Sequence, residues 1–458
     1  MFLFWEHGMD YVPASGLRYL FIDFNAFFAA AAQHDEPDLM GRPVVITPHK
    51  SEYSGAIAAS YEARPFGITR GTRIREAREL CPDLVVRPAR HDRYVGLHKQ
   101  LMSAIGTVLP VDKVYSIDEA AFRLGRRERE REAALAVAEE VKEIITKRVG
   151  PAFRSSIGLA QTRLLGKLAA GMNKPDGLTV LEASDLPGKL LGLPLSKIPG
   201  VGGGIEKRLA QNGVTDFRGL WDLAPKHARA IWHSVQGERF WYALHGYEVA
   251  EPPTKTMMFG HSRVLTSGYR SPDKARAVAR ALLLKAAARL RMAGLLATRL
   301  SLNMKRAPDG VSDVEVGFEA SRDSTRFLDA LNELWRHASE SLDAKNQGME
   351  LSHVSVFLHG LMAPDDPRAV QGDLFACAGR AEERAEKGRL WEVIDQLNRD
   401  ADGRLARLAA PPGKGAKRRM GSTLPRHVML ADQQAIDLDY LGTKIAFSRV
   451  PKEEEFLC

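Results

Sequence analysis

The sequence has few cysteines and no long apolar run, and these absences exclude several classes of protein. Among 458 residues only Cys81, Cys377 and Cys458 are cysteines, without the paired spacing of a zinc site or a disulfide framework. No apolar run approaches the roughly 18 residues of a membrane span, and Met1 to Trp5 is too short for a signal peptide. We therefore expect a cytoplasmic protein that does not bind a membrane.

Aromatic residues are also sparse, at 7%, whereas charged residues are abundant and unbalanced. The 65 basic and 57 acidic residues give a net charge of +8. Such an excess favours a polyanionic partner, although a merely basic protein fits the charge equally well. At roughly 100 to 200 residues per domain, the length predicts three to five domains.

Two strand-like segments carry carboxylates. Tyr19 to Asp23 (YLFID) reads as a buried strand that ends in an acid, and Val114 to Phe122 (VYSIDEAAF) contains the adjacent acids Asp118 and Glu119. Because successive strand residues point to opposite faces, these two acids can share one site only at a twist or a strand end. Three carboxylates in one sheet could hold divalent cations for phosphoryl transfer. Ordinary strand-end acids remain the alternative.

The part that follows Pro252 and Pro253 shows a β-α-β-β-α-β order, which is typical of a ferredoxin-like module. We predict strands over 262–265, 298–305, 314–318 and 354–358, and helices over 273–295 and 324–342. In the strand over 298–305 the side chains alternate. Those expected to face inward are Leu300, Leu302 and Met304, and those expected to face outward are Arg299, Ser301, Asn303 and Lys305.

Two strings, Asp23-Phe24-Asn25-Ala26-Phe27-Phe28 and Ser116-Ile117-Asp118-Glu119-Ala120, resemble in sequence and order the motifs of the Y-family translesion DNA polymerases. The resemblance is to the bacterial DNA polymerase IV (DinB-like) group and runs from about Tyr19 to Gly360. It implies error-prone, template-directed DNA synthesis past damaged bases, on primer-template DNA with deoxynucleoside triphosphates, by a monomer.

The resemblance also implies an α+β multidomain fold shaped like a right hand, with a palm, small fingers, a helix-hairpin-helix thumb and a ferredoxin-like little finger. The expected boundaries are palm 17–30 and 95–185, fingers 31–94, thumb 186–251, little finger 256–362 and a flexible C-terminal tail 363–458.

In this family the acids that match Asp23, Asp118 and Glu119 are catalytic and bind two Mg²⁺ ions, for which Mn²⁺ can substitute. The carbonyl of Phe24 is implied as a further metal ligand. Phe28 matches the steric gate, whose flat ring leaves no room for a ribose 2′-hydroxyl. The resemblance therefore implies a two-metal centre that selects deoxynucleotides.

Three further residues match the family's triphosphate contacts. Tyr61 and Arg64 lie in the fingers string SYEARPFG, and Lys174 lies in the string NKPDG. An arginine fork can donate two hydrogen bonds to phosphate oxygens, and a lysine supplies a point charge. The chain departs from the family at Asn25, where a second acid is common, and at Ala58, where relatives carry Ser or Thr.

Candidate DNA contacts occur in two places. Ile198-Pro199-Gly200-Val201-Gly202, followed by Lys207, resembles a helix-hairpin-helix, in which glycines let backbone amides approach a phosphate. A plain glycine-rich turn is the alternative. The ferredoxin-like module resembles the family's little finger, whose polar sheet face grips duplex DNA. It supplies the remaining phosphate-contact candidates, which are Arg263, Arg299, Asn303 and Lys305, and the alternation gives the last three a common face.

The string Gln371-Gly372-Asp373-Leu374-Phe375 resembles the peptide that bacterial polymerases insert into the sliding clamp. Leu374 and Phe375 would anchor in an apolar groove while Gln371 sets the register.

Three other functions each account for part of the sequence. A noncatalytic family member could act as a scaffold, but the acids and Lys174 argue against it. A nucleotide cyclase with similar acids would leave the hairpin, the fingers string and the clamp string unexplained. A two-metal nuclease would have no use for a steric gate or for cations that contact a triphosphate.

Overall fold

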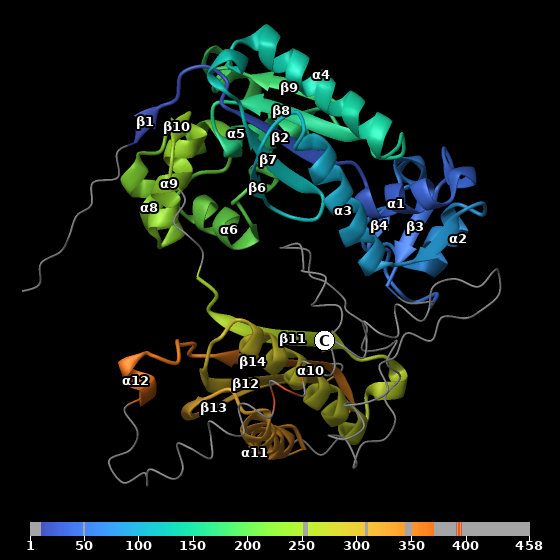
Figure 1. Ribbon diagram of the computed structural model, residues 1–458, viewed down its shortest axis with the longest axis vertical. Helices are drawn as coiled ribbons and strands as arrows, with labels where there is room; N and C mark the ends of the chain where they lie inside the picture. The colour runs from blue at the N-terminus through green and yellow to red at the C-terminus, as the bar shows by residue number, and fades with distance from the viewer. Residues whose placement is uncertain are drawn as a thin grey trace, which may run out of the picture. The chain divides into compact units, whose positions relative to one another are not determined.

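The structure is a computed structural model that describes residues 11–48, 51–250, 255–306, 310–343 and 350–370, together with Trp391, Val393 and Asp395. The chain folds as two compact units that part between Pro252 and Pro253 (Figure 1). No helix in the described ranges is both long and apolar enough to cross a membrane.

A five-stranded sheet with the strand order β6-β7-β2-β8-β9 forms the centre of the first unit (Figure 1). The central strand β2 is antiparallel to β7 and β8, whereas β8 and β9 are parallel. Leu20 and Ile22 in β2 are fully buried, as expected for a strand that is covered on both faces. The strands are β2 (Tyr19–Phe24), β6 (Val111–Val114), β7 (Glu119–Arg123), β8 (Ser155–Ala160) and β9 (Leu178–Leu181).

Helices pack closely on this sheet. A Cβ atom added to Gly158 of β8 would lie 2.0 Å from the carbonyl oxygen of Gly166, so helix α5 rests its backbone directly on the strand. Helix α5 contacts both β8 and the central strand β2. The helices that surround the sheet are α1 (Phe27–Asp35), α3 (His91–Ile105), α4 (Arg131–Arg148) and α5 (Arg163–Met172).

A small lobe is inserted between α1 and α3. Its sheet has the order β4-β3-β5, and the fingers string that contains Tyr61 and Arg64 forms the 3₁₀ helix η2. Ile68 and Ile74 are fully buried in its core. The elements are η1 (Pro37–Leu39), β3 (Val44–Thr47), β4 (Ala58–Ala59), η2 (Tyr61–Phe66), α2 (Ile74–Leu80) and β5 (Val85–Pro88).

Short helices follow β9 and end the first unit. Strand β10 (Tyr247–Glu248) pairs with the N-terminal strand β1 (Val12–Pro13), so the start of the described chain is joined to the end of this unit. The remaining elements are η3 (Arg126–Glu128), η4 (Ala183–Asp185), η5 (Gly188–Leu190), η6 (Leu195–Lys197), α6 (Gly203–Gln211), α7 (Phe217–Trp221), α8 (Pro225–Trp232) and α9 (Val235–Leu244).

The N-terminal segment from Tyr11 to Arg18 braces this region, and we refer to it as the N-terminal brace. The ring of Tyr11 stacks on Tyr242 of α9 with 3.5 Å between the ring centroids. Glu248 accepts hydrogen bonds from Arg18 and from Arg123 of β7. The brace therefore links the central sheet to the helices that follow it.

The second unit has the predicted β-α-β-β-α-β order, with the sheet order β11-β14-β12-β13. Leu300, Leu302 and Met304 are fully buried, and Arg299 and Lys305 are exposed, which confirms the predicted alternation. The elements are β11 (Met258–Val264), η7 (Ser267–Tyr269), α10 (Pro272–Met292), β12 (Ala297–Arg306), β13 (Val311–Ser321), α11 (Ser324–Asp343), β14 (Leu351–His359) and α12 (Pro367–Val370).

Two residues from the predicted flexible tail contact this unit. Asp395 accepts hydrogen bonds from the buried guanidinium of Arg291, at 2.6 Å from Nε and 3.0 Å from Nη2. Trp391 is buried and donates its indole N–H to Asp323 at 2.9 Å. The prediction of a flexible tail therefore does not hold at these two positions. Trp391 is buried, and Asp395 forms an ion pair with Arg291.

Candidate active site

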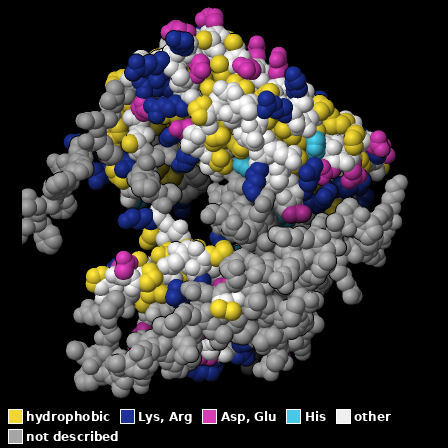
Figure 2. Space-filling model, in the orientation of Figure 1, with side chains coloured by type: hydrophobic (Ala, Val, Ile, Leu, Met, Phe, Trp, Pro, Cys, Tyr) yellow, Lys and Arg dark blue, Asp and Glu magenta, His cyan; other side chains and the backbone are white. Residues whose placement is uncertain are grey.

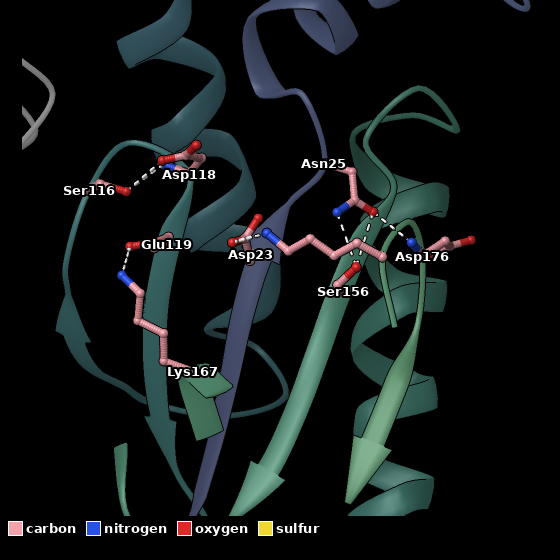
Figure 3. A network of polar contacts seen from close by, with 9 residues as sticks. Asp23, Asn25, Ser116, Asp118, Glu119, Ser156, Lys167 and Asp176 are labelled. Carbon is pink, nitrogen blue, oxygen red and sulfur yellow. Dashed lines mark hydrogen bonds and ion pairs between the residues drawn. The ribbon is translucent and has the colours of Figure 1, made fainter. Parts of the chain in front are cut away.

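The three acids predicted to be catalytic lie at one end of the central sheet (Figure 3). Asp23 and Glu119 are partners across the antiparallel pair of β2 and β7. Asp118 immediately precedes β7, and its carbonyl oxygen accepts a hydrogen bond from the Phe24 N–H at 2.9 Å. Strand β7 begins at Glu119, so the expected strand end lies between the two adjacent acids.

Each acid has a partner that the sequence did not identify (Figure 3). Lys167 of α5 lies 2.6 Å from Glu119, and Ser116 donates a hydrogen bond to Asp118 at 2.5 Å. Asp23 forms an ion pair with Lys174. The two lysines neutralise part of the negative charge of the site.

Burial raises the pKa of Asp23 to about 6, even though Lys174 acts in the opposite direction. The neighbouring charges of Glu119 and Asp118 contribute to this increase in the pKa. The ionised carboxylate of Asp23 is thus less stabilised than it is in water, because burial and like charges outweigh one lysine. Additional positive charge near Asp23 would therefore stabilise its ionised carboxylate.

The donor set fits a hard divalent cation. It consists of the Asp23, Asp118 and Glu119 carboxylates and the Phe24 carbonyl, and oxygen is the ligand type that Mg²⁺ prefers. Within the described residues, no group of three or more His, Cys, Asp or Glu side chains has the spacing of an assembled metal site. In this structure the carboxylates are instead engaged by Lys167, Lys174 and Ser116.

His98 of α3 supports the loop before Asp118. It is buried, and its Nδ1 lies 2.8 Å from the Ile117 carbonyl oxygen. Burial lowers the pKa of His98, which favours the neutral ring, and Nδ1 must carry the proton because a carbonyl oxygen only accepts. No sequence signal marks this role, since a single histidine in a helix has no distinctive spacing.

The two phenylalanines at the start of α1 have different environments. Phe27 is 2% exposed, whereas Phe28 is partly exposed and stacks on Tyr94 with 4.4 Å between the ring centroids. Ala26, just before the helix, has a φ of 50°, in the left-handed region that few non-glycine residues adopt. The turn thus leaves Phe28 accessible and held by a second ring.

The predicted triphosphate contacts lie in two places. Lys174 lies beside the acids through its ion pair with Asp23. Tyr61 and Arg64 lie together in η2, where the guanidinium carbon of Arg64 is 3.5 Å from the centroid of the Tyr61 ring.

Two glycines shape the hairpin that was predicted to bind DNA. Gly200 has a φ of 92°, and Gly202 is the N-cap of α6. Gly202 and Lys207 are both exposed. The first N–H groups of a helix lack partners within the helix and can meet an anion.

The little-finger candidates do not all share one face. The side chains of β12 alternate between a buried and an open face, and the open face carries Arg299, Asn303 and Lys305. Arg299 forms an ion pair with Glu315 at 3.0 Å. Arg263 is 5% exposed, and the alternation of β11 places it on the same face as Phe259, which packs in the core. The structure thus places Arg263 differently from the prediction, because its strand turns it away from the open face. The clamp string with Gln371, Leu374 and Phe375 lies outside the described residues.

The fold and these acids define a palm-type nucleotidyl-transfer domain joined to a ferredoxin-like module. Residues 22–171 match the impB/mucB/samB family, and residues 258–374 match the impB/mucB/samB family C-terminal domain. The chain is 32% identical over 412 residues to DNA polymerase IV of Moorella thermoacetica, covering 88% of this chain and 98% of that protein.

A second relative, DNA polymerase IV of Pelotomaculum thermopropionicum, is 36% identical over 191 residues, which cover 42% of this chain and 47% of that protein. A solved Y-family DNA polymerase chimera (Dbh-Dpo4-Dbh) has a similar fold, with a TM-score of 0.62 at 21% identity over 76% of this chain and 99% of its own. The chain belongs to the DNA polymerase IV (DinB-like) group of the Y-family DNA polymerases. It is a DNA-directed DNA polymerase of the translesion type.

Proposed function

We propose that the chain extends a DNA primer by two-metal phosphoryl transfer, with Asp23, Asp118 and Glu119 holding two Mg²⁺ ions and Mn²⁺ able to replace them. The observation that carries this proposal is the cross-strand pairing of Asp23 with Glu119, with Asp118 next to them. When bound, the ions supply activation of the primer 3′-hydroxyl and charge stabilisation of the triphosphate.

The protein's own groups bind and select the nucleotide. Lys174 exchanges its contact with Asp23 for the triphosphate, and the stacked pair of Tyr61 and Arg64 provides further donors. Phe28 excludes a 2′-hydroxyl, because its stacking on Tyr94 prevents the ring from moving aside. These roles are supported by the positions of the side chains and by family membership.

DNA is held through its phosphates. The amides near Gly200 and Gly202, with Lys207, bind the backbone without reading bases, and Arg299, Asn303 and Lys305 extend the contact on the open face of β12. In the view of Figure 2, basic and acidic side chains are interspersed over the first unit.

The sliding clamp is a proposed partner through Gln371, Leu374 and Phe375. A triple alanine variant at these positions is expected to lose clamp binding and to keep unassisted primer extension. Unchanged binding to a purified bacterial sliding clamp would contradict the assignment.

Primer extension on a defined template with Mg²⁺ tests the polymerase proposal. The double variant Asp118→Ala/Glu119→Ala is expected to lose at least about a thousandfold in rate, because removal of metal ligands abolishes charge stabilisation in the transition state. The matched control is Glu139→Ala/Glu140→Ala, which removes two exposed acids of α4 and is expected to extend normally.

Three outcomes would count against the proposal. Extension that survives the loss of both acids would refute the two-metal centre. Equal loss in the control pair would show a nonspecific effect. A native chain that folds and binds DNA but does not extend a primer would favour the scaffold function.

A further inference from the structure

The turn that carries Lys174 is joined to the end of β2 by one buried amide. The Oδ1 atom of Asn25 accepts a hydrogen bond from the backbone N–H of Asp176 at 2.7 Å, as Figure 3 shows. Asp176 is two residues beyond Lys174, and Asn25 is two residues beyond Asp23. One hydrogen bond therefore connects the strand that carries an acid to the turn that carries its cation.

Asn25 is itself held rigidly. Its N–H donates to the carbonyl of Arg154 at 2.9 Å, and its Nδ2 lies 3.1 Å from Oγ of Ser156. Asn25 is 6% exposed and Ser156 is 1% exposed. Ser156 is also the β8 partner of Asp23, so Asn25, Ser156 and Asp23 form one fixed group at the end of the sheet.

The turn needs such support because its backbone is constrained. Asp176 has a φ of 56°, a conformation that costs energy for a residue with a side chain. On its other side, Asp176 is held by an ion pair with Lys142 at 2.8 Å. Loss of the Asn25 amide would leave the turn attached through Lys142 and displaced at the end nearest the acids.

The Asn25 side chain carries no charge, and this affects Lys174 as well as the turn. An amide provides an acceptor for the Asp176 N–H and a donor for Ser156 without adding charge. A carboxylate here would add a further buried negative charge close to Asp23 and would compete for Lys174. The amide thus fixes the turn and leaves the lysine charge available to a phosphate.

We propose that Asn25 is a positioning residue that sets the place of Lys174 for binding the triphosphate of the incoming nucleotide. This inference rests on the proposed function of Lys174 and assigns a role to a residue that departs from the usual family motif. Asn25 acts through the turn and touches neither metal nor substrate.

A double-mutant cycle with steady-state kinetics tests the coupling. Asn25→Ala is expected to raise KM for the deoxynucleotide about tenfold, in keeping with the loss of one hydrogen bond that fixes the turn, and to change kcat by less than about threefold. In a Lys174→Ala background the same change is expected to have no further effect on KM. Multiplicative effects of the two substitutions would overturn the proposal.

Equilibrium binding separates this inference from the polymerase proposal. A primer that ends in a dideoxynucleotide forms no new bond, so deoxynucleotide affinity for the protein–DNA complex reports on the triphosphate site alone. The native protein–DNA complex is expected to bind the deoxynucleotide about tenfold more tightly than the Asn25→Ala complex does. Equal affinities, with a native chain that extends primers, would refute the role of Asn25 alone.

Folding controls complete the test. Ser156→Ala removes one support of Asn25 and is expected to raise KM in the same direction by a smaller factor; an unchanged KM would contradict the proposed group. Asn332→Ala in α11 loses an asparagine that hydrogen-bonds to Arg276 and is expected to leave KM unchanged. If Asn25→Ala lowers the melting temperature and its KM effect persists in the Lys174→Ala background, the role is structural and the proposal fails.

Discussion

Gly177 occupies a tightly packed position in the turn that carries Lys174. A Cβ atom added to Gly177 would lie 1.8 Å from the carbonyl oxygen of Asn173. Gly177→Ala is therefore expected to displace the turn and raise KM for the nucleotide about tenfold, with a loss of roughly 1 to 3 kcal/mol of stability. Kinetics and urea unfolding measure the two effects.

Gly171→Ala provides the matched control for this prediction. A Cβ atom at Gly171 meets nothing within 4 Å, so the same change in size is expected to leave KM unchanged. A normal KM in Gly177→Ala would show that the turn tolerates the displacement.

His245 predicts a pH dependence of stability. Its ring lies between Trp221 and Trp241, with centroid distances of 3.9 Å and 3.7 Å, and burial lowers its pKa from 6.5. Below about pH 6.5 the unfolded state binds the proton more readily than the folded state, so stability falls as the pH decreases. His245→Gln is expected to flatten this dependence between pH 7 and pH 5 in urea unfolding.

The quantity to compare is the slope of the unfolding free energy against pH. The absolute stability is less informative, because the substitution also removes the ring stacking. His227→Gln, at an exposed position of α8, is the control and should keep the native slope. An unchanged slope in His245→Gln would contradict the prediction.

For single residues, the sequence identified the catalytic acids but not the side chains that position these acids. Asp118 and Glu119 stand out because adjacent acids interrupt an apolar strand. Lys167 and His98 did not stand out, since their contacts with Glu119 and Ile117 span 48 and 19 residues of sequence. Such pairings exist only after the helices have packed on the sheet.

At the scale of secondary-structure elements, the carboxylate of Glu248 links the N-terminal brace to the central sheet. Glu248 accepts hydrogen bonds from Arg18, Arg123 and the hydroxyl of Tyr19. Glu248→Ala would leave two neighbouring arginines without their shared anion and is expected to cost roughly 1 to 3 kcal/mol. Thermal unfolding of the full chain measures this loss.

An exposed ion pair serves as the comparison. Arg75 and Glu79 are 69% and 68% exposed in their side chains, so Glu79→Ala is expected to change stability by less than about 0.5 kcal/mol. A similarly small effect in Glu248→Ala would show that the hydrogen bonds of Glu248 do not stabilise the fold.

Periodic elements were predictable, and short ones were not. Strands with alternating side chains, such as β12, and long helices, such as α10, follow directly from the apolar pattern. Strand β1 has only two residues, Val12 and Pro13, and no pattern of its own, because its pairing with β10 comes from the tertiary fold. The fingers string, which contains Pro65, forms a 3₁₀ helix.

For the molecule as a whole, the net charge of +8 predicted a polyanionic partner without locating the contact. If Lys207 and Lys305 each neutralise one phosphate, Lys207→Ala and Lys305→Ala are each expected to reduce the slope of log K against log salt by about 1. DNA binding measured from low to moderate salt gives this slope.

Lys147→Ala, which removes an exposed charge of α4, should leave the slope at its native value. A native slope in Lys207→Ala or Lys305→Ala would remove that residue from the phosphate contacts. The order of elements in the second unit was predictable because its helices and strands alternate with clear periods, whereas the inward turn of Arg263 was not.

The contact of Trp391 and Asp395 with the second unit limits how the chain can be truncated. Removing everything beyond Phe375 would delete the carboxylate that pairs with Arg291, whose side chain is 3% exposed. A buried arginine without its anion is strongly destabilising. A truncated chain would therefore lose stability for a reason unrelated to any partner, and a shortened polymerase that retains its little finger should end after Asp395.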